Sequence, residues 1–127
     1  MPSTLTFSDD GTVITALVSG DVTLEISLQI LSDIIRLVHS SGVRKVLVDV
    51  RGITAPLQTW DLHQFGISIG EHRREHMTYA VVGSGDLSAH RFVETVAINR
   101  GAEIRVFDDP DVALAWLRAR SVPKTVE

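Results

Sequence analysis

The segment Val43–Gly52 constrains the fold of this chain more than any other stretch of its sequence. Valine or leucine occupies four of the six positions in Lys45–Val50. A short apolar run bounded by charged residues and a glycine is typical of a strand buried on both faces, as in the interior of a parallel sheet. We therefore expect Lys45–Val50 to be a central strand of the fold.

Two further strands are expected at the beginning of the chain. Leu5–Ser8 and Thr12–Ser19 are rich in apolar and β-branched residues, and Asp9–Gly11 between them ends in the Asp-Gly pair that favours a tight hairpin. The two strands should pair antiparallel. The outer edge of Leu5–Ser8 could also pair with a second copy of the chain, which would give a homodimer.

The segment Val22–Ser41 shows both strand and helix periodicity. We interpret it as a helix, because about twenty residues exceed the usual length of a strand. Thr23 can cap its first turn and Gly42 stands where a terminating glycine is preferred. A helix here makes Thr12–Ser19 and Lys45–Val50 parallel neighbours joined by a right-handed crossover.

The second half of the chain repeats the alternation of helices and strands. In order, we expect a loop over Ile53–Thr59, a helix over Trp60–Glu71, a strand over Tyr79–Gly83, a helix over Leu87–Arg100, a strand over Ala102–Phe107 and a helix over Pro110–Ala119. Phe92 and Val112 are expected to face the core from the last two helices.

The sum is a single α/β domain over residues 1–120, followed by a tail over residues 121–127. Its order is β-β-α-β-α-β-α-β-α. We expect a mostly parallel five-stranded sheet with an antiparallel N-terminal edge hairpin and helices packed on both faces.

Composition excludes several classes of protein. The chain has no cysteine, which excludes disulfides and thiolate chemistry. No apolar run approaches the roughly 18 residues of a membrane span, and the first residues do not follow a signal-peptide pattern. We expect a cytoplasmic protein. The net charge of −4 argues against a nucleic-acid partner.

Two motifs suggest chemistry. His72–His76 spells the H-x-x-E-H zinc pattern, but it ends two residues before a strand, so the helix should stop inside it. Gly83–Asp86 follows a strand as dinucleotide-binding glycines do, yet Ser88 occupies the third glycine position. We expect a solvated helix end at the first and a turn capped by Asp86 at the second, with anion binding as the alternative there. We assign no catalytic residue, metal or cofactor.

The carboxyl ends of the expected strands mark a candidate site, because ligands of open α/β sheets bind there. The residues at these ends are Asp49, Arg51, Gly52, Gly83, Ser84, Gly85, Asp108 and Asp109. Arg51 is the cation of this set. It could bind a ligand or partner, or it could pair with Asp49 or Asp108 and fix the loops.

Several stretches resemble a known family. Val46–Gly52 resembles the central strand of STAS domains, the fold of sulfate transporters and anti-sigma-factor antagonists. Phe92–Gly101, Ile104–Asp108 and Ala113–Leu117 are similar to the SpoIIAA-like branch, which is often grouped with CRAL-TRIO lipid-binding domains. The resemblance covers most of the chain and implies the element order given above.

The resemblance also implies a regulatory role. In the family's antagonists, a serine in an Asp-Ser motif after the central strand is phosphorylated by a partner kinase. The Asp and Ser positions of that motif fall at Leu57 and Gln58 here, so the motif is absent. Thr59 is the nearest hydroxyl and is the candidate phosphorylation site.

We therefore expect a non-enzymatic interaction module that binds a protein partner through the loop and helix after Gly52. The alternative is a carrier of a small hydrophobic ligand or lipid, with Trp60–Glu71 as a lid. The two differ in whether the apolar residues of that helix line a cavity of several hundred cubic ångströms. The candidate binding residues are Asp49, Arg51, Gly52, Trp60, Phe65, Gly83, Ser84 and Asp108.

Overall fold

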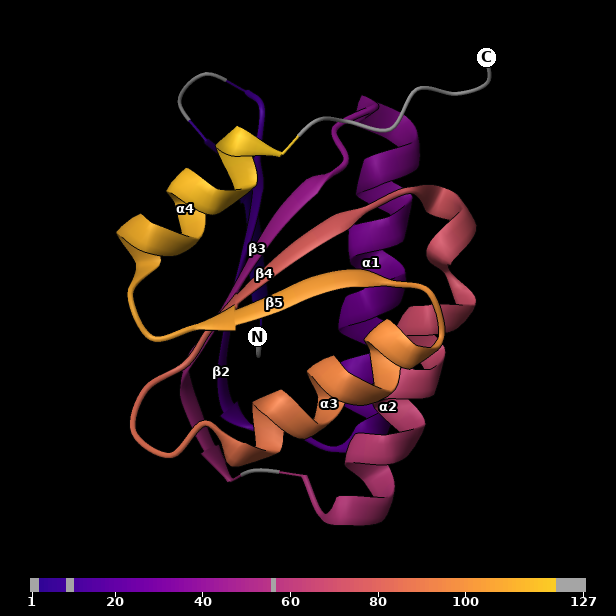
Figure 1. The fold of residues 1–127 in the computed structure, drawn as a ribbon, viewed down its shortest axis with the longest axis vertical. Coiled ribbons are helices and arrows are strands. Elements are labelled where there is room, and N and C mark those ends of the chain that lie inside the picture. The colour runs from indigo at the N-terminus through magenta and orange to yellow at the C-terminus, as the bar shows by residue number, and fades with distance from the viewer. Residues whose placement is uncertain (1–2, 9–10, 56, 121–127) are drawn as a thin grey trace.

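The computed structural model describes residues 3–8, 11–55 and 57–120, and the strands in these residues form one sheet. The order across the sheet is β1 (Ser3–Phe7), β2 (Ile14–Asp21), β3 (Lys45–Ala55), β4 (Thr78–Val82) and β5 (Glu103–Phe107). β1 is antiparallel to β2, and the other neighbours are parallel (Figure 1). The expected mostly parallel sheet with an antiparallel edge hairpin is confirmed. The expected tail over residues 121–127 and part of the Asp9–Gly11 turn lie outside the described residues.

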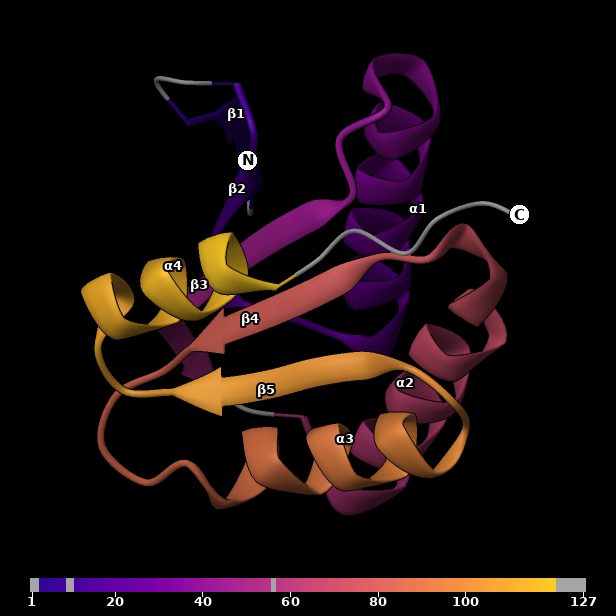
Figure 2. The ribbon, with the colours of Figure 1, turned by 45° about the horizontal axis from the view of Figure 1, so that its top comes forward.

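Helices cover both faces of the sheet. They are α1 (Leu24–Ser41), α2 (Thr59–Glu71), α3 (Ser88–Asn99) and α4 (Pro110–Ala119), with a short 3-10 helix, η1, at Arg73–Glu75. α1, α2 and α3 lie on one face, and α4 lies alone on the other (Figure 2). None of the helices in the described ranges is long and apolar enough to cross a membrane.

The ends of α1 follow the signals in its sequence. The hydroxyl of Thr23 accepts a hydrogen bond of 3.1 Å from the backbone N–H of Ile26. At the other end, Gly42 adopts φ 77°, and its N–H donates to the carbonyl of Val38. A left-handed residue at this position ends a helix at little steric cost only when it is glycine.

β3 is longer than expected. The prediction that a loop begins at Ile53 is wrong, because the strand continues to Ala55. β2 continues to Asp21 through two register shifts and pairs with the second half of β3. Gly52 lies inside this pairing, and a Cβ atom there would lie 2.9 Å from the Cβ of Ser19. Gly52 is therefore a point of close approach between two strands, not the end of a strand.

The core has two parts, separated by the sheet. The larger part lies between the sheet and α1, α2 and α3, and the smaller part lies under α4 around Ala113 and Leu117. Two expected core residues face solvent instead, because Phe92 is 37% exposed and Val112 is 54% exposed. Val112 lies on the outer flank of α4, and Phe92 lies at the edge of α3 beside His63 of α2.

α2 packs closely against α3 through two glycines. A Cβ atom at Gly66 would lie 2.7 Å from the Cβ of Val96, and one at Gly70 would lie 2.2 Å from the Cβ of Arg100. Real Cβ atoms do not approach neighbours this closely, so both positions require glycine. The glycines lower the intrinsic helix propensity of α2 and allow the two helices to touch.

We predict that Gly66→Ala destabilises the protein by about 1–3 kcal/mol, although alanine is the better helix former. The reason is that the new methyl group overlaps Val96 and forces α2 away from α3. Urea denaturation measures the effect. The control is Glu71→Ala at the exposed end of the same helix, which should stay within about 0.5 kcal/mol of the wild type. A Gly66→Ala protein as stable as the wild type would contradict the close packing.

Candidate functional site

Asp49 and Arg51 form an ion pair within β3. The guanidinium donates from Nη2 to Asp49 Oδ2 at 2.7 Å and from Nε to Oδ1 at 3.0 Å. These hydrogen bonds hold the pKa of Asp49 below its usual value. Because side chains alternate along a strand and Leu47 packs under α4, the pair lies on the α4 face of the sheet. The pairing is the structural role that the sequence offered as the alternative for Arg51.

Of the other residues at the strand ends, Asp109 caps the start of α4 and acts electrostatically on Arg51. Gly83 is buried, and a Cβ atom there would lie 2.9 Å from Cδ2 of His90. Ser84 and Asp108 are exposed. Asp86 accepts hydrogen bonds from the backbone N–H and the hydroxyl of Ser88, which lower its pKa. Its carboxylate therefore occupies the start of α3, where an anion would bind.

The H-x-x-E-H segment does not form a zinc-binding face. α2 ends at Glu71, and His76 adopts a left-handed conformation after η1. Glu75 instead lies 2.5 Å from Nε2 of His39, at the end of α1, and this contact lowers the pKa of Glu75. Across the described ranges, no group of three or more potential ligands is placed to hold a metal ion.

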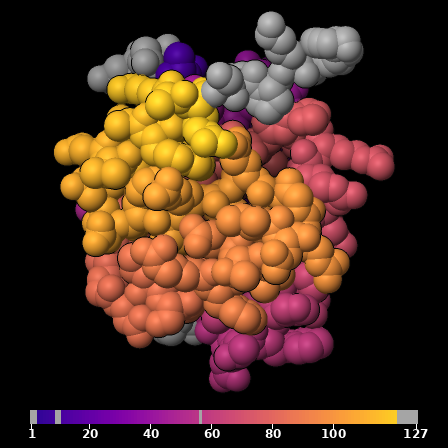
Figure 3. All heavy atoms as spheres, viewed as in Figure 1, coloured from indigo at the N-terminus to yellow at the C-terminus, as the bar shows by residue number. Residues whose placement is uncertain are grey.

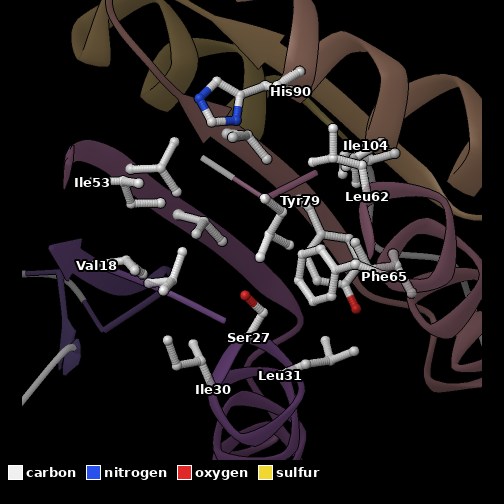
Figure 4. A pocket seen from close by; sticks show the side chains of 18 of the residues that line it. Val18, Ser27, Ile30, Leu31, Ile53, Leu62, Phe65, Tyr79, His90 and Ile104 are labelled. Carbon is white, nitrogen blue, oxygen red and sulfur yellow. The ribbon is translucent and has the colours of Figure 1, made fainter. Parts of the chain in front are cut away.

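An apolar pocket of about 120 Å³ lies between the sheet and the helices α1, α2 and α3 (Figure 4). The lining comes from β2, β3, β4 and β5, from all three helices, from Val22 in the loop before α1 and from Leu57 in the loop before α2. The polar side chains in the lining are Ser27, Tyr79 and His90. The apolar ones are Val18, Val22, Ile30, Leu31, Ile34, Val48, Val50, Ile53, Leu57, Leu62, Phe65, Ile69, Val81, Ala89, Val93 and Ile104.

The floor of the pocket is formed by side chains of the sheet that the helices do not fully cover. Val48, Val50 and Val81 lie on the central strands and face the helices, a position where side chains are normally fully buried, yet each is only partly buried. The contacts at Gly66 and Gly70 hold α2 against α3. The sheet between α1 and α3 is consequently left incompletely covered.

Two polar side chains of the pocket have no hydrogen-bond partner among the described residues. Ser27 is only 8% exposed, and Figure 4 shows its oxygen pointing into the space between the lining side chains. His90 borders the pocket from the first turn of α3, and burial lowers its pKa, so its ring is neutral at neutral pH. The third, Tyr79, directs its hydroxyl to the sulfur of Met77 instead, at 3.7 Å.

The candidate residues of α2 divide between its two sides. Phe65 lines the pocket together with Ile69, whereas Trp60 is 70% exposed on the outside. The Trp60 ring lies 6.2 Å from the ring of His63, which lies 6.4 Å from the ring of Phe92. We call these three residues the aromatic row. The start of α2, which carries Trp60, projects from the body of the molecule beside α3 (Figure 3).

Thr59 is exposed and is the first residue of α2. The residue before it, Gln58, stands at the N-cap position without a side-chain capping bond.

Sequence reasoning did not identify Ser27 or His90 as pocket residues. Ser27 had one detectable signal, because it precedes Ile30 and Ile34 by three and seven residues and so falls on the buried stripe of α1. A polar residue on such a stripe requires a partner or a cavity. The exposure of Phe92 had no local signal.

Comparison with known proteins agrees with this fold. A family model described as SpoIIAA-like matches residues 13–118. No curated protein matches the chain. One similar solved structure is an uncharacterised DUF3478-family protein with a SpoIIAA-like fold from Shewanella loihica PV-4, with TM-score 0.59, 22% identity and coverage of 91% of each chain.

Two further similar structures have lower sequence identity. An anti-sigma factor antagonist from Mycobacterium paratuberculosis gives TM-score 0.60 at 17% identity, covering 91% of this chain and 92% of that one. The anti-sigma factor antagonist SpoIIAA in its unphosphorylated form gives TM-score 0.58 at 11% identity, covering 93% and 99%. These likenesses show a common fold. The family match extends over most of the sequence and confirms the resemblance seen there, so the chain belongs to the SpoIIAA-like family.

Proposed function

We propose that this protein is a regulatory interaction module that binds a protein partner through the aromatic row at the start of α2. The observation that carries the proposal is the exposure of Trp60, which is 70% accessible and extends into a line of rings with His63 and Phe92. Exposed aromatic groups of this kind mark interaction surfaces, and tryptophan is the residue most enriched at binding hot spots.

The family supports a role of this class. Two of the similar structures are described as anti-sigma factor antagonists, a role that is exercised on another protein. Two of the three residues of the aromatic row, Trp60 and His63, also lie on the helix that follows the central strand, where the sequence predicted the partner site. The proposal involves no catalytic step.

The polar candidates at the strand ends stay outside the proposed surface. Asp49 and Arg51 satisfy each other on the opposite face of the sheet. Gly83 lies against the side chains of Leu87 and His90, and Gly52 is required by its close contact with Ser19. We propose that these residues maintain the fold around the site and do not touch the partner.

Thr59 is the proposed site of a charge-based switch on this surface. A phosphate there would stand at the first residue of α2, where the helix dipole favours negative charge. It would also stand next to Trp60, so a partner that covers the aromatic row would have to desolvate it. Phosphorylation at Thr59 should therefore stabilise α2 and weaken partner binding.

The pocket bears on the alternative function, carriage of a hydrophobic ligand. Its 120 Å³ is well below the roughly 300 Å³ at which pockets for larger organic ligands begin. A lipid acyl chain does not fit without opening the helices. The volume favours a much smaller ligand, and we do not propose lipid carriage.

We predict that Trp60→Ala lowers the capture of the native partner by about 30-fold or more, the loss typical of a hot-spot residue. Affinity capture from cells of the source organism, quantified by mass spectrometry, measures it. The matched control is Val112→Ala, which removes an exposed apolar side chain from α4 on the other face. Val112→Ala and Arg51→Ala should capture the partner as the wild type does. Equal capture by Trp60→Ala and wild type would contradict the proposed surface.

We predict that Thr59→Glu raises the free energy of unfolding by about 0.3–1 kcal/mol, because a carboxylate at the first turn complements the helix dipole. The same variant should lower partner capture, whereas the uncharged variant Thr59→Ser should not. Calorimetry and the capture assay measure the two effects. Partner binding that is unaffected by Thr59→Glu would exclude the switch and leave the aromatic row to be tested by Trp60→Ala.

A further inference from the structure

We propose that the pocket beneath α2 is a binding site for a small, neutral molecule with an apolar body of about one aromatic ring and one hydroxyl group, and that Ser27 binds the hydroxyl. This goes beyond partner binding, because the pocket and the aromatic row lie on different sides of α2.

The pocket is unfilled apolar space. Val48, Val50 and Val81 are left partly uncovered although they lie on central strands and face the helices. Apolar side chains on central strands normally pack closely against the helices above them, and each contact left unmade forfeits dispersion energy. An apolar ligand would restore those contacts and remove the three side chains from water.

The volume of the pocket limits the size of the ligand. An engineered apolar cavity of about 150 Å³ in another protein holds a benzene molecule. The present pocket, of about 120 Å³, is slightly smaller and is also lined by valine, leucine, isoleucine and phenylalanine. A single ring fits this volume, and a long alkyl chain exceeds it.

The residues that line the pocket determine the charge that the ligand can carry. The lining holds no lysine, arginine, aspartate or glutamate, and its one titratable group near neutrality, His90, is held neutral by burial. A charged ligand would lose its hydration without gaining a counter-charge, which is costly in an apolar site. The pocket therefore selects a neutral molecule.

The polar side chains of the pocket indicate which polar group the ligand carries. The Ser27 side chain is only 8% exposed, but its oxygen is still open to water, since no side-chain oxygen or nitrogen that is cut off from solvent lacks a partner in the described residues. A ligand hydroxyl that replaces this water keeps the hydrogen bond of Ser27. The Ser27 oxygen points into the pocket and has no partner in the described part of the chain (Figure 4). A neutral imidazole such as that of His90 can donate one hydrogen bond and accept another. Because His90 lies at the other end of the pocket from Ser27 (Figure 4), a single ligand hydroxyl reaches one of them, and we assign it to Ser27.

The test uses phenol as the probe, with benzene, benzoate and dodecanol as comparisons. Methyl resonances of Ile30, Val81 and Ile104 are followed by NMR during titration of the full chain, and the melting temperature is measured in parallel. We expect phenol to shift these methyl groups and to raise the melting temperature, since a ligand that binds the folded state stabilises it. Benzoate should fail because of its charge, and dodecanol because of its length.

Two variants assign the binding to the pocket. Ala89→Leu places a larger side chain at the rim and should weaken phenol binding by about tenfold or more, whereas Ala115→Leu, on an exposed position of α4, should leave it unchanged. Ser27→Ala should weaken phenol binding by about threefold to tenfold and leave benzene binding unchanged, because only phenol uses the hydroxyl. The benzene comparison also shows that Ser27→Ala still has a folded pocket.

Several outcomes would overturn the proposal. The pocket site is wrong if phenol shifts none of the three methyl groups at millimolar concentration, or shifts resonances of the aromatic row instead. Benzoate binding as tight as phenol binding would refute the selection for a neutral ligand. Dodecanol binding as tight as phenol binding would refute the size limit and favour lipid carriage. None of these outcomes depends on whether Trp60→Ala lowers partner capture. The pocket proposal and the proposed function can therefore fail independently of each other.

Discussion

The close contact between α2 and α3 at Gly66 and Gly70 is the interaction on which the rest of the structure depends. Because these positions have no side chain, α2 lies against α3 and does not settle over the middle of the sheet. The floor between α1 and α3 then stays open as a pocket. On the outside, the same contact brings His63 of α2 beside Phe92 of α3 and so builds the aromatic row. One helix thus serves an apolar interior site and an aromatic surface.

The element types and most of their ends were predictable because their signals are local. Thr23 and Gly42 bound α1 by capping bonds between neighbours in sequence, and Pro110 begins α4 after the capping carboxylate of Asp109. The length of β3 was not predictable in this way. Its extension to Ala55 depends on β2, more than thirty residues earlier, through register shifts that no local pattern announces.

The candidate site was predictable only in part. Trp60 and Phe65 were identified from their type, but their opposite orientations follow from how α2 is rotated against its neighbours, which is a property of the tertiary packing. The ion pair of Asp49 and Arg51 was one of the roles that the sequence left open for Arg51, and the extension of β3 past Val50 places the two residues on one face of the same strand. The pocket itself could not be predicted, because unfilled volume arises from how helices of given shape meet, and hydrophobic periodicity does not record it.

The central claim is that the α2–α3 contact leaves an ordered apolar cavity under α2. A crystal structure determined under xenon pressure tests this most directly, because xenon enters dry apolar cavities of about this size. The account predicts a xenon atom among Ile30, Val81 and Ile104, with α2 still touching α3 at Gly66. A structure with no xenon there, in which Phe65 or Leu62 has moved in to fill the space, would contradict it.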